Sequence, residues 1–200
     1  LDSVARQFVV LASEYYRLID IPVSWFGFIG AGMSLIGILN ARISRVLVSK
    51  CSPFFNFLFL SAVLMAGLIG ISYAVPIVGV LFAIGAFAMM GMVQFQASYY
   101  LNREADSQIR ATVLSFKGLA LNLGLGTASL LYTTLVATLR YRQDAQVDGQ
   151  VLNEQIFLDA LAAFPVYYLL LFVLVILAAR RLVGDSSIFF ALPASQADTR

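Results

Sequence analysis

Long apolar runs alternate with short polar connectors along the whole chain. A membrane-spanning helix needs about 20 mainly apolar residues, because the hydrocarbon core is about 30 Å thick and a helix rises about 1.5 Å per residue. Runs of this length lie at about 22–41, 53–72, 76–101, 111–139 and 156–179. In lipid an open sheet would leave backbone groups unpaired, and a barrel would show short alternating strands. The pattern predicts an all-α membrane protein, a polytopic helical bundle.

The first 21 residues differ from these runs because charged side chains interrupt them. This segment is too short and too charged for a full span. We expect either a surface helix or the end of a further span whose beginning is absent. Residues 1–183 would then form one transmembrane bundle with an incomplete first helix, and residues 184–200 a flexible cytoplasmic tail.

Composition narrows the class of protein further. Hydrophobic residues make up 60% of the 200-residue chain and charged residues 12%, against about 25% charged in soluble domains. The net charge of +2 provides no basic surface for nucleic acid. Membrane lipid is therefore the expected surrounding and partner, and we predict an integral protein of the cell membrane (inner or plasma membrane).

The polar residues offer no recognisable catalytic set. The chain has no histidine and a single cysteine, Cys51, which excludes histidine-dependent triads, paired-cysteine zinc sites and an internal disulfide. Paired carboxylates at membrane depth and a phosphate-binding loop are also missing. We expect no enzymatic activity, no metal and no cofactor.

Basic residues are unevenly divided between alternate connectors, and this predicts the orientation. One set of connectors holds Arg42, Arg45, Lys50, Arg103, Arg110, Arg180 and Arg181. The other set holds Arg17, Arg140 and Arg142 together with five acidic residues, Glu14, Asp20, Asp144, Asp148 and Glu154. Because cytoplasmic loops are enriched in Lys and Arg, we expect the first set and the C-terminus to lie in the cytoplasm.

Several polar residues fall inside the apolar runs. Lys117 lies about 10 Å from the cytoplasmic end of its run at 1.5 Å per residue, Gln94 is at a similar depth, and Asn122 is deeper. Such residues often mark a solute pathway. Two alternatives remain open at this stage: Lys117 can extend its amine to the headgroups, and the two amides can join neighbouring helices.

Glycines are also unevenly distributed among the runs. The run 22–41 has four glycines and 111–139 has three, whereas 53–72 and 156–179 are more uniformly apolar. Small residues allow close helix packing, so we expect the glycine-bearing helices inside the bundle and the other two toward lipid.

Two stretches resemble the C-terminal half of a major facilitator superfamily transporter. Residues 37–45 (GILNARISR) are similar to a degenerate cytoplasmic loop signature of that family, in which Gly37, Arg42 and Arg45 match. Ala41 stands where the family has an aspartate. Residues 100–115 are similar to the family's link between helices ten and eleven, a short polar loop before an Arg-Ala-Thr helix start.

This resemblance implies that residues 1–21 end helix seven and that the five spans are helices eight to twelve. It implies a secondary transporter moving a small solute by alternating access, with the N-terminal half of the same transporter as the missing partner. The implied cavity wall comprises Arg6, Gln7, Glu14, Gln94, Lys117 and Asn122. Glu14 is the expected site of coupling to a proton or another ion. The alternative is a non-transporting membrane scaffold or interaction protein of transporter-like fold.

Overall fold

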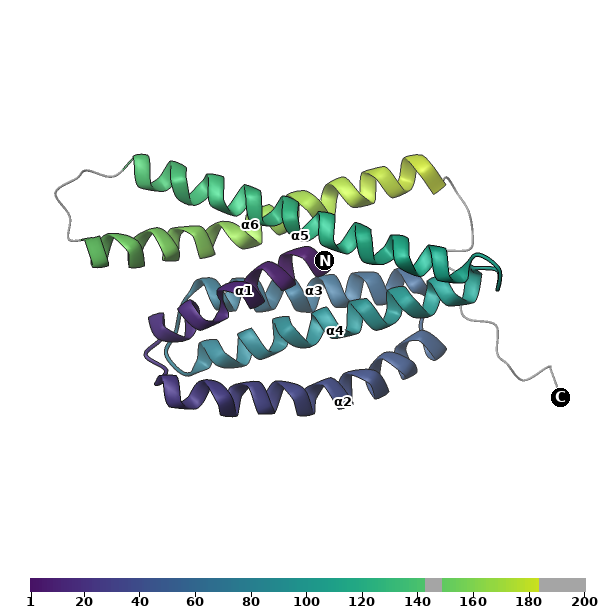
Figure 1. The fold of residues 1–200 in the computed structure, drawn as a ribbon, viewed down its shortest axis with the longest axis horizontal. Helices are drawn as coiled ribbons and strands as arrows, with labels where there is room; N and C mark the ends of the chain where they lie inside the picture. Colours follow the sequence, from purple (N-terminus) through teal and green to yellow (C-terminus); the bar gives the residue numbers. More distant parts are fainter. Residues whose placement is uncertain (143–148, 184–200) are drawn as a thin grey trace.

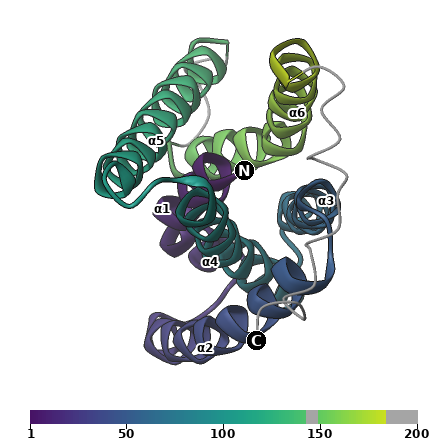
Figure 2. The same cartoon turned by 90° about the vertical axis from the view of Figure 1, so that its right-hand side faces the viewer.

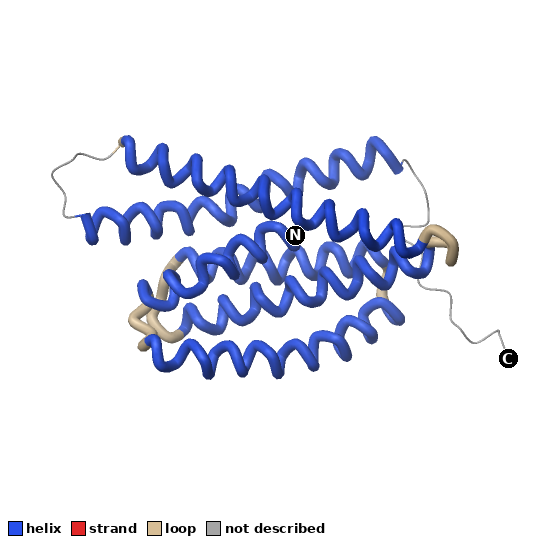
Figure 3. Tube along the Cα trace, viewed as in Figure 1, coloured by secondary structure: helices blue, strands red, loops and turns tan. Residues whose placement is uncertain are grey.

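The computed structural model describes residues 1–142 and 149–183. This part is helical and without strands (Figures 1 and 3), which confirms the predicted fold class at that level. The expected tail, 184–200, lies outside the described residues. In chain order the elements are α1 (Asp2–Leu18), the 3-10 helix η1 (Val23–Trp25), α2 (Phe26–Lys50), α3 (Pro53–Ser72), α4 (Val78–Glu104), α5 (Arg110–Tyr141) and α6 (Gly149–Val183).

Five helical segments of the described chain are long and apolar enough to cross a membrane. They are Val23–Lys50, Pro53–Ser72, Val78–Glu104, Arg110–Tyr141 and Val151–Ala178. Each contains one of the runs predicted from the sequence or most of it. The structure is therefore compatible with an integral membrane protein. The helix α1 is shorter, at 17 residues.

Helix ends follow from local chemistry, with one departure from expectation. The hydroxyl of Ser52 accepts the backbone N–H of Phe55 at 3.2 Å, and Pro53 occupies the first turn, so α3 begins there. The helix α2 continues without a break to Lys50. The stretch 37–45, expected as a loop signature, therefore belongs to the last turns of a helix, because nothing between the apolar run and Cys51 interrupts helical hydrogen bonding.

Pro165 lies inside α6. A proline ring removes one helical hydrogen bond and pushes on the preceding turn, which bends the helix. Figure 2 shows α6 changing direction in its middle. The predicted kink is present.

The helices are arranged around a central pair. The helices α1 and α4 pack against each other, α2 packs on α4, and α5 packs on α1. Figure 2 shows α2 and α5 at opposite ends of one side of this pair, with α3 and α6 on the other side. The helices α3 and α6 also contact each other, partly through the stacked rings of Phe57 and Phe172 at 5.6 Å between centroids.

Polar side chains reinforce the contacts of α2. The amide of Asn40 donates to the backbone carbonyl of Ala88 on α4 at 3.0 Å. The end of the bundle at which α2 finishes, with Arg42, Arg45 and Lys50, is called the basic end below. There the amide of Asn56 on α3 donates to the carbonyl of Leu47 on α2 and to the hydroxyl of Tyr100 on α4. Because Asn56 is buried, these bonds replace water at this corner.

The packing reverses one expectation. The helices α2 and α5 are the least covered of the candidate spans, with 6% of their most apolar windows buried, against 44% for α3. On α2, the space beside Gly27, Gly30, Gly32 and Gly37 is open. The prediction that glycine-bearing helices occupy the inside is therefore wrong for contacts among the described residues, because these residues supply nothing to pack against the glycines of α2.

Two glycines on α3 provide a matched test of its packing on α4. A methyl group at Gly70 would overlap the ring of Phe82, whereas one at Gly67 would meet Phe82 and Ala86 at ordinary contact distances of 3.5 and 3.7 Å. We predict that Gly70→Ala lowers the free energy of unfolding by about 1–3 kcal/mol through overpacking, and that Gly67→Ala leaves it unchanged or raises it slightly. Detergent unfolding of the purified protein measures both.

A further variant identifies the cause of that loss. Combining Gly70→Ala with Phe82→Leu should recover part of the lost stability, since the smaller side chain clears the added methyl group. Equal effects of the two glycine variants would contradict the close approach of α3 to α4.

Candidate polar site at the centre of the bundle

A polar network connects α1, α4 and α5. Asp2 on α1 is 3% exposed and is the centre of the network. One of its carboxylate oxygens accepts the amide of Gln94 on α4 at 2.9 Å, and the other lies 3.1 Å from a guanidinium nitrogen of Arg6, one turn along α1. A second guanidinium nitrogen of Arg6 donates to the side-chain oxygen of Asn122 on α5 at 3.1 Å. The ion pair within α1 is thus hydrogen-bonded to both α4 and α5.

This network lies far from both ends of the spanning helices. At about 1.5 Å per residue, Asn122 is about 18 Å from the start of α5 and Gln94 about 15 Å from the end of α4. Those distances correspond to the middle of a hydrocarbon core about 30 Å thick. Figure 1 shows the beginning of α1 midway along the bundle, in agreement with this depth.

Lys117 belongs to an adjoining group. Its amine donates to the hydroxyl of Ser98 on α4 at 2.6 Å. That hydroxyl donates in turn to the backbone carbonyl of Gln94 at 2.8 Å, so the group joins the network through α4. Ser98 lies about 9 Å from the end of α4, which is close to the depth of Lys117. The amine is therefore directed across to α4 and does not extend to the headgroups.

The remaining predicted pathway residues are placed differently. Gln7 is buried, and its side-chain oxygen accepts the hydroxyl of Ser129 on α5 at 2.6 Å. Glu14 lies two turns beyond Arg6 and pairs only loosely with Arg17, at 3.7 Å, with both side chains more than 60% exposed. The structure thus brings Arg6, Gln94 and Asn122 together, sets Lys117 and Gln7 beside them, and leaves Glu14 apart.

Sequence reasoning missed Asp2 as a site residue. Its position within the charged first segment gave no indication that it is buried. The signal that could have identified it is the spacing of Asp2 and Arg6, which places opposite charges one helical turn apart.

The loop-signature residues form a different region. Gly37, Arg42 and Arg45 lie on α2, with open space beside Gly37 and with both arginines exposed. They share no contact with the central network. The end of α2 that carries them lies at the same end of the bundle as the α4–α5 connection and the end of α6 (Figure 1). The larger of the two sets of basic residues is therefore located at this one end of the bundle.

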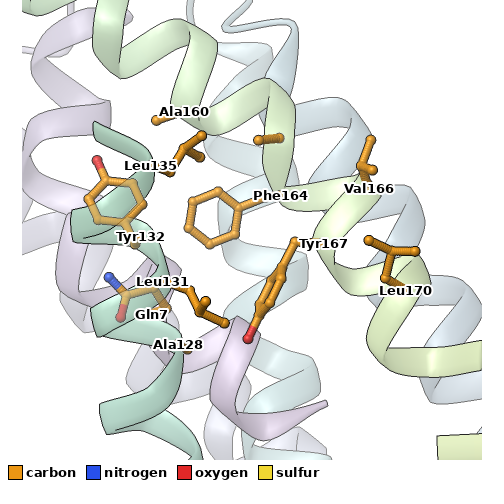
Figure 4. A pocket seen from close by; sticks show the side chains of 11 residues that line it. Gln7, Ala128, Leu131, Tyr132, Leu135, Ala160, Phe164, Val166, Tyr167 and Leu170 are labelled. Atoms are coloured by element: carbon orange, nitrogen blue, oxygen red, sulfur yellow. The ribbon is translucent and has the colours of Figure 1, made fainter. Parts of the chain in front are cut away.

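An apolar pocket of about 410 Å³ lies between α1, α5 and α6 (Figure 4). Phe164 and Tyr167 of α6 face Leu131 and Tyr132 of α5 across it. Gln7 is the only amide in its lining, and its oxygen is already engaged by Ser129. This lining suits hydrocarbon and supplies no charge to recognise a polar solute, so we place the candidate site at the network.

Within the described residues no cluster of acidic, cysteine or histidine side chains could hold a metal ion. Comparisons with protein-family models, curated proteins and solved structures found no match to this chain. The chemistry that the described residues offer is that of the network, an arrangement of charges and amides held at membrane depth.

The two ion pairs of α1 predict contrasting effects of neutralising their acids. Asp2→Asn removes the counter-charge of Arg6 in a buried setting, and we expect a loss of about 2 kcal/mol in unfolding free energy. Glu14→Gln, in the exposed pair, should change it by less than about 1 kcal/mol. Unfolding of the purified variants in mixed micelles measures this difference, and equal small losses would show that the Asp2 pair is not a structural link.

Proposed function

We propose that this chain is the C-terminal half of a major facilitator-type secondary transporter, which moves a small solute by alternating access. The observation that carries the proposal is the polar network at membrane depth, contributed by three helices. Polar and ionisable groups at this depth are costly, and they mark solute or ion pathways where they converge. In transporters with internal repeats, the solute site lies near the midplane at the meeting of the repeats.

The packing supports this proposal through its near-symmetry. Exchanging α1, α2 and α3 for α4, α5 and α6 maps the contact of α1 with α5 onto that of α4 with α2, and leaves the α1–α4 and α3–α6 contacts in place. Each unit has three helices, an odd number. The first helix of the second unit therefore runs opposite to the first helix of the first unit, and the two units are inverted relative to each other in the membrane. The contact between α3 and α4 is more extensive than that between α1 and α6, as expected for an α1 of 17 residues and an α4 of 27.

The open sides of α2 and α5 support the other half as the missing partner. Both helices lie on the side of the central pair away from α3 and α6, and both have glycines with open space beside them. A second bundle laid against α2 and α5 would cover these glycines. It would also enclose the network between the two halves, while α3 and α6 face lipid.

The orientation and the ion coupling complete the proposal. The basic end of the bundle faces the cytoplasm, which places the C-terminus there. Coupling to a proton or another ion is assigned to Glu14, whose exposed carboxylate is open to exchange. An unchanged pH dependence of uptake in Glu14→Gln would remove that role.

Thiol labelling from each side of the membrane tests alternating access without knowledge of the solute. In the complete polypeptide with Cys51→Ser, we predict that Asn122→Cys and Gln94→Cys react with a membrane-impermeant maleimide in both right-side-out and inside-out vesicles. The reason is that a midplane site opens to each side in turn. Ala86→Cys is the matched control, because Ala86 on α4 is fully buried and should stay unlabelled.

The competing function is a membrane scaffold of the same fold. A scaffold would hold its amides in a packed interface, so both engineered cysteines would stay unlabelled from either side. That result would overturn the transport proposal while leaving the fold intact.

A further inference from the structure

The charges at membrane depth do not balance. In the described helices, the charged residues of the polar network and its adjoining group are Asp2, Arg6 and Lys117. Glu14 and Arg17 form a separate pair nearer the other end of α1. Among the side chains of the described residues, the central site therefore carries one negative and two positive charges, an excess of one positive charge.

The carboxylate of Asp2 already has a charged partner in Arg6, although its Oδ2 atom accepts no hydrogen bond. This carboxylate is buried, one oxygen accepts from Gln94, and the other faces Arg6. The geometry assigns the charge of Asp2 to Arg6, and leaves none of it for a cationic solute. Among the described residues, a cation entering the central site would find no carboxylate that lacks a charged partner.

Lys117 is the uncompensated charge. Among the described residues it makes no ion pair, and its amine donates to the hydroxyl of Ser98. Because that hydroxyl donates its own proton to the carbonyl of Gln94, it can accept from Lys117 but supplies no negative charge. An ammonium group at this depth is stabilised far better by an anion than by a neutral oxygen.

The neighbouring face of α5 leaves room for such an anion. Gly118 and Gly126 have open space where a side chain would project, and each lies one turn from Asn122, which is exposed. Residues four apart share one face of a helix. An open, small-sided face therefore lies beside the network and adjoins Lys117.

We propose that the solute is a small organic anion carrying a carboxylate, whose charge is balanced by Lys117 and whose oxygens accept from the amide of Asn122 and from Arg6. This inference rests on the proposed transport function and specifies its substrate class. The apolar pocket between α5 and α6 stays a site for hydrocarbon, separate from this one.

Charged thiol reagents of similar size measure the local potential. In the complete polypeptide with Cys51→Ser, Gly118→Cys and Gly126→Cys introduce reporters that keep every network residue. Each reporter is reacted with sulfonatoethyl methanethiosulfonate, an anion, and trimethylammonioethyl methanethiosulfonate, a cation, and each rate is divided by that of a free thiol in the same buffer. At Gly118→Cys, next to Lys117, we expect the normalised rate to favour the anion by about tenfold, since one charge within about 10 Å acts oppositely on the two reagents. At Gly126→Cys, about 13.5 Å from Lys117 along α5, we expect a smaller preference of the same sign.

Variants of Lys117 assign the preference to its charge. Lys117→Gln should reduce the anion preference at least about threefold, and Lys117→Arg should retain it. Lys50→Gln is the control, because it removes an exposed positive charge at the far end of α2 and should leave the ratio unchanged.

The outcomes separate this inference from the proposed function. Reaction with both reagents without anion preference, or a preference that survives Lys117→Gln, would overturn the anionic substrate class while supporting an aqueous pathway. No reaction with either reagent at either reporter would overturn both.

Discussion

The carboxylate of Asp2 is the interaction on which the centre of the structure depends. A charge removed from water must find a partner, because its solvation is otherwise lost. Here the partners come from α1 itself through Arg6 and from α4 through Gln94, and Arg6 extends the link to α5 through Asn122. The bundle thus holds its central helices together by directional bonds as well as by packing. In lipid the hydrophobic effect does little to bring helices together, so such hydrogen bonds also specify which helix faces lie against each other.

Apolar packing completes that arrangement, both within the α1–α4 pair and between α3 and α4. Gly79 on α4 lies against the buried ring of Tyr15 from α1, and Gly70 on α3 lies against Phe82. Glycine is required at these points because the aromatic rings occupy the space of a side chain. The glycines of α2 have no such neighbours in this chain. Glycine in a membrane helix therefore has two different meanings here, a filled contact in α3 and α4 and an open surface in α2.

The spans could be predicted from the sequence because length and hydropathy alone determine them. The proline bend could be predicted as well, since Pro165 acts on its own helix. The site was harder to predict. Gln94, Asn122 and Lys117 were recognisable by their depth, but depth gives no information on direction. The contact of Lys117 with Ser98 depends on how α5 is rotated against α4, and the burial of Asp2 depends on a helix that is itself too charged to count as a span. Both features are determined by how the helices pack together, which the sequence of a single helix does not reveal.

The amide of Asn56 has a mechanical consequence. By donating to Leu47 of α2 and to Tyr100 of α4, it ties the start of α3 to its two neighbours at the basic end. Nothing comparable joins the opposite end of α2 to α3 or α4 among the described contacts. A tilting movement of α2 would therefore hinge at its basic end and, at its other end, would have to break the edge-on contact of Phe26 with the ring of Tyr16 on α1, 5.4 Å between centroids.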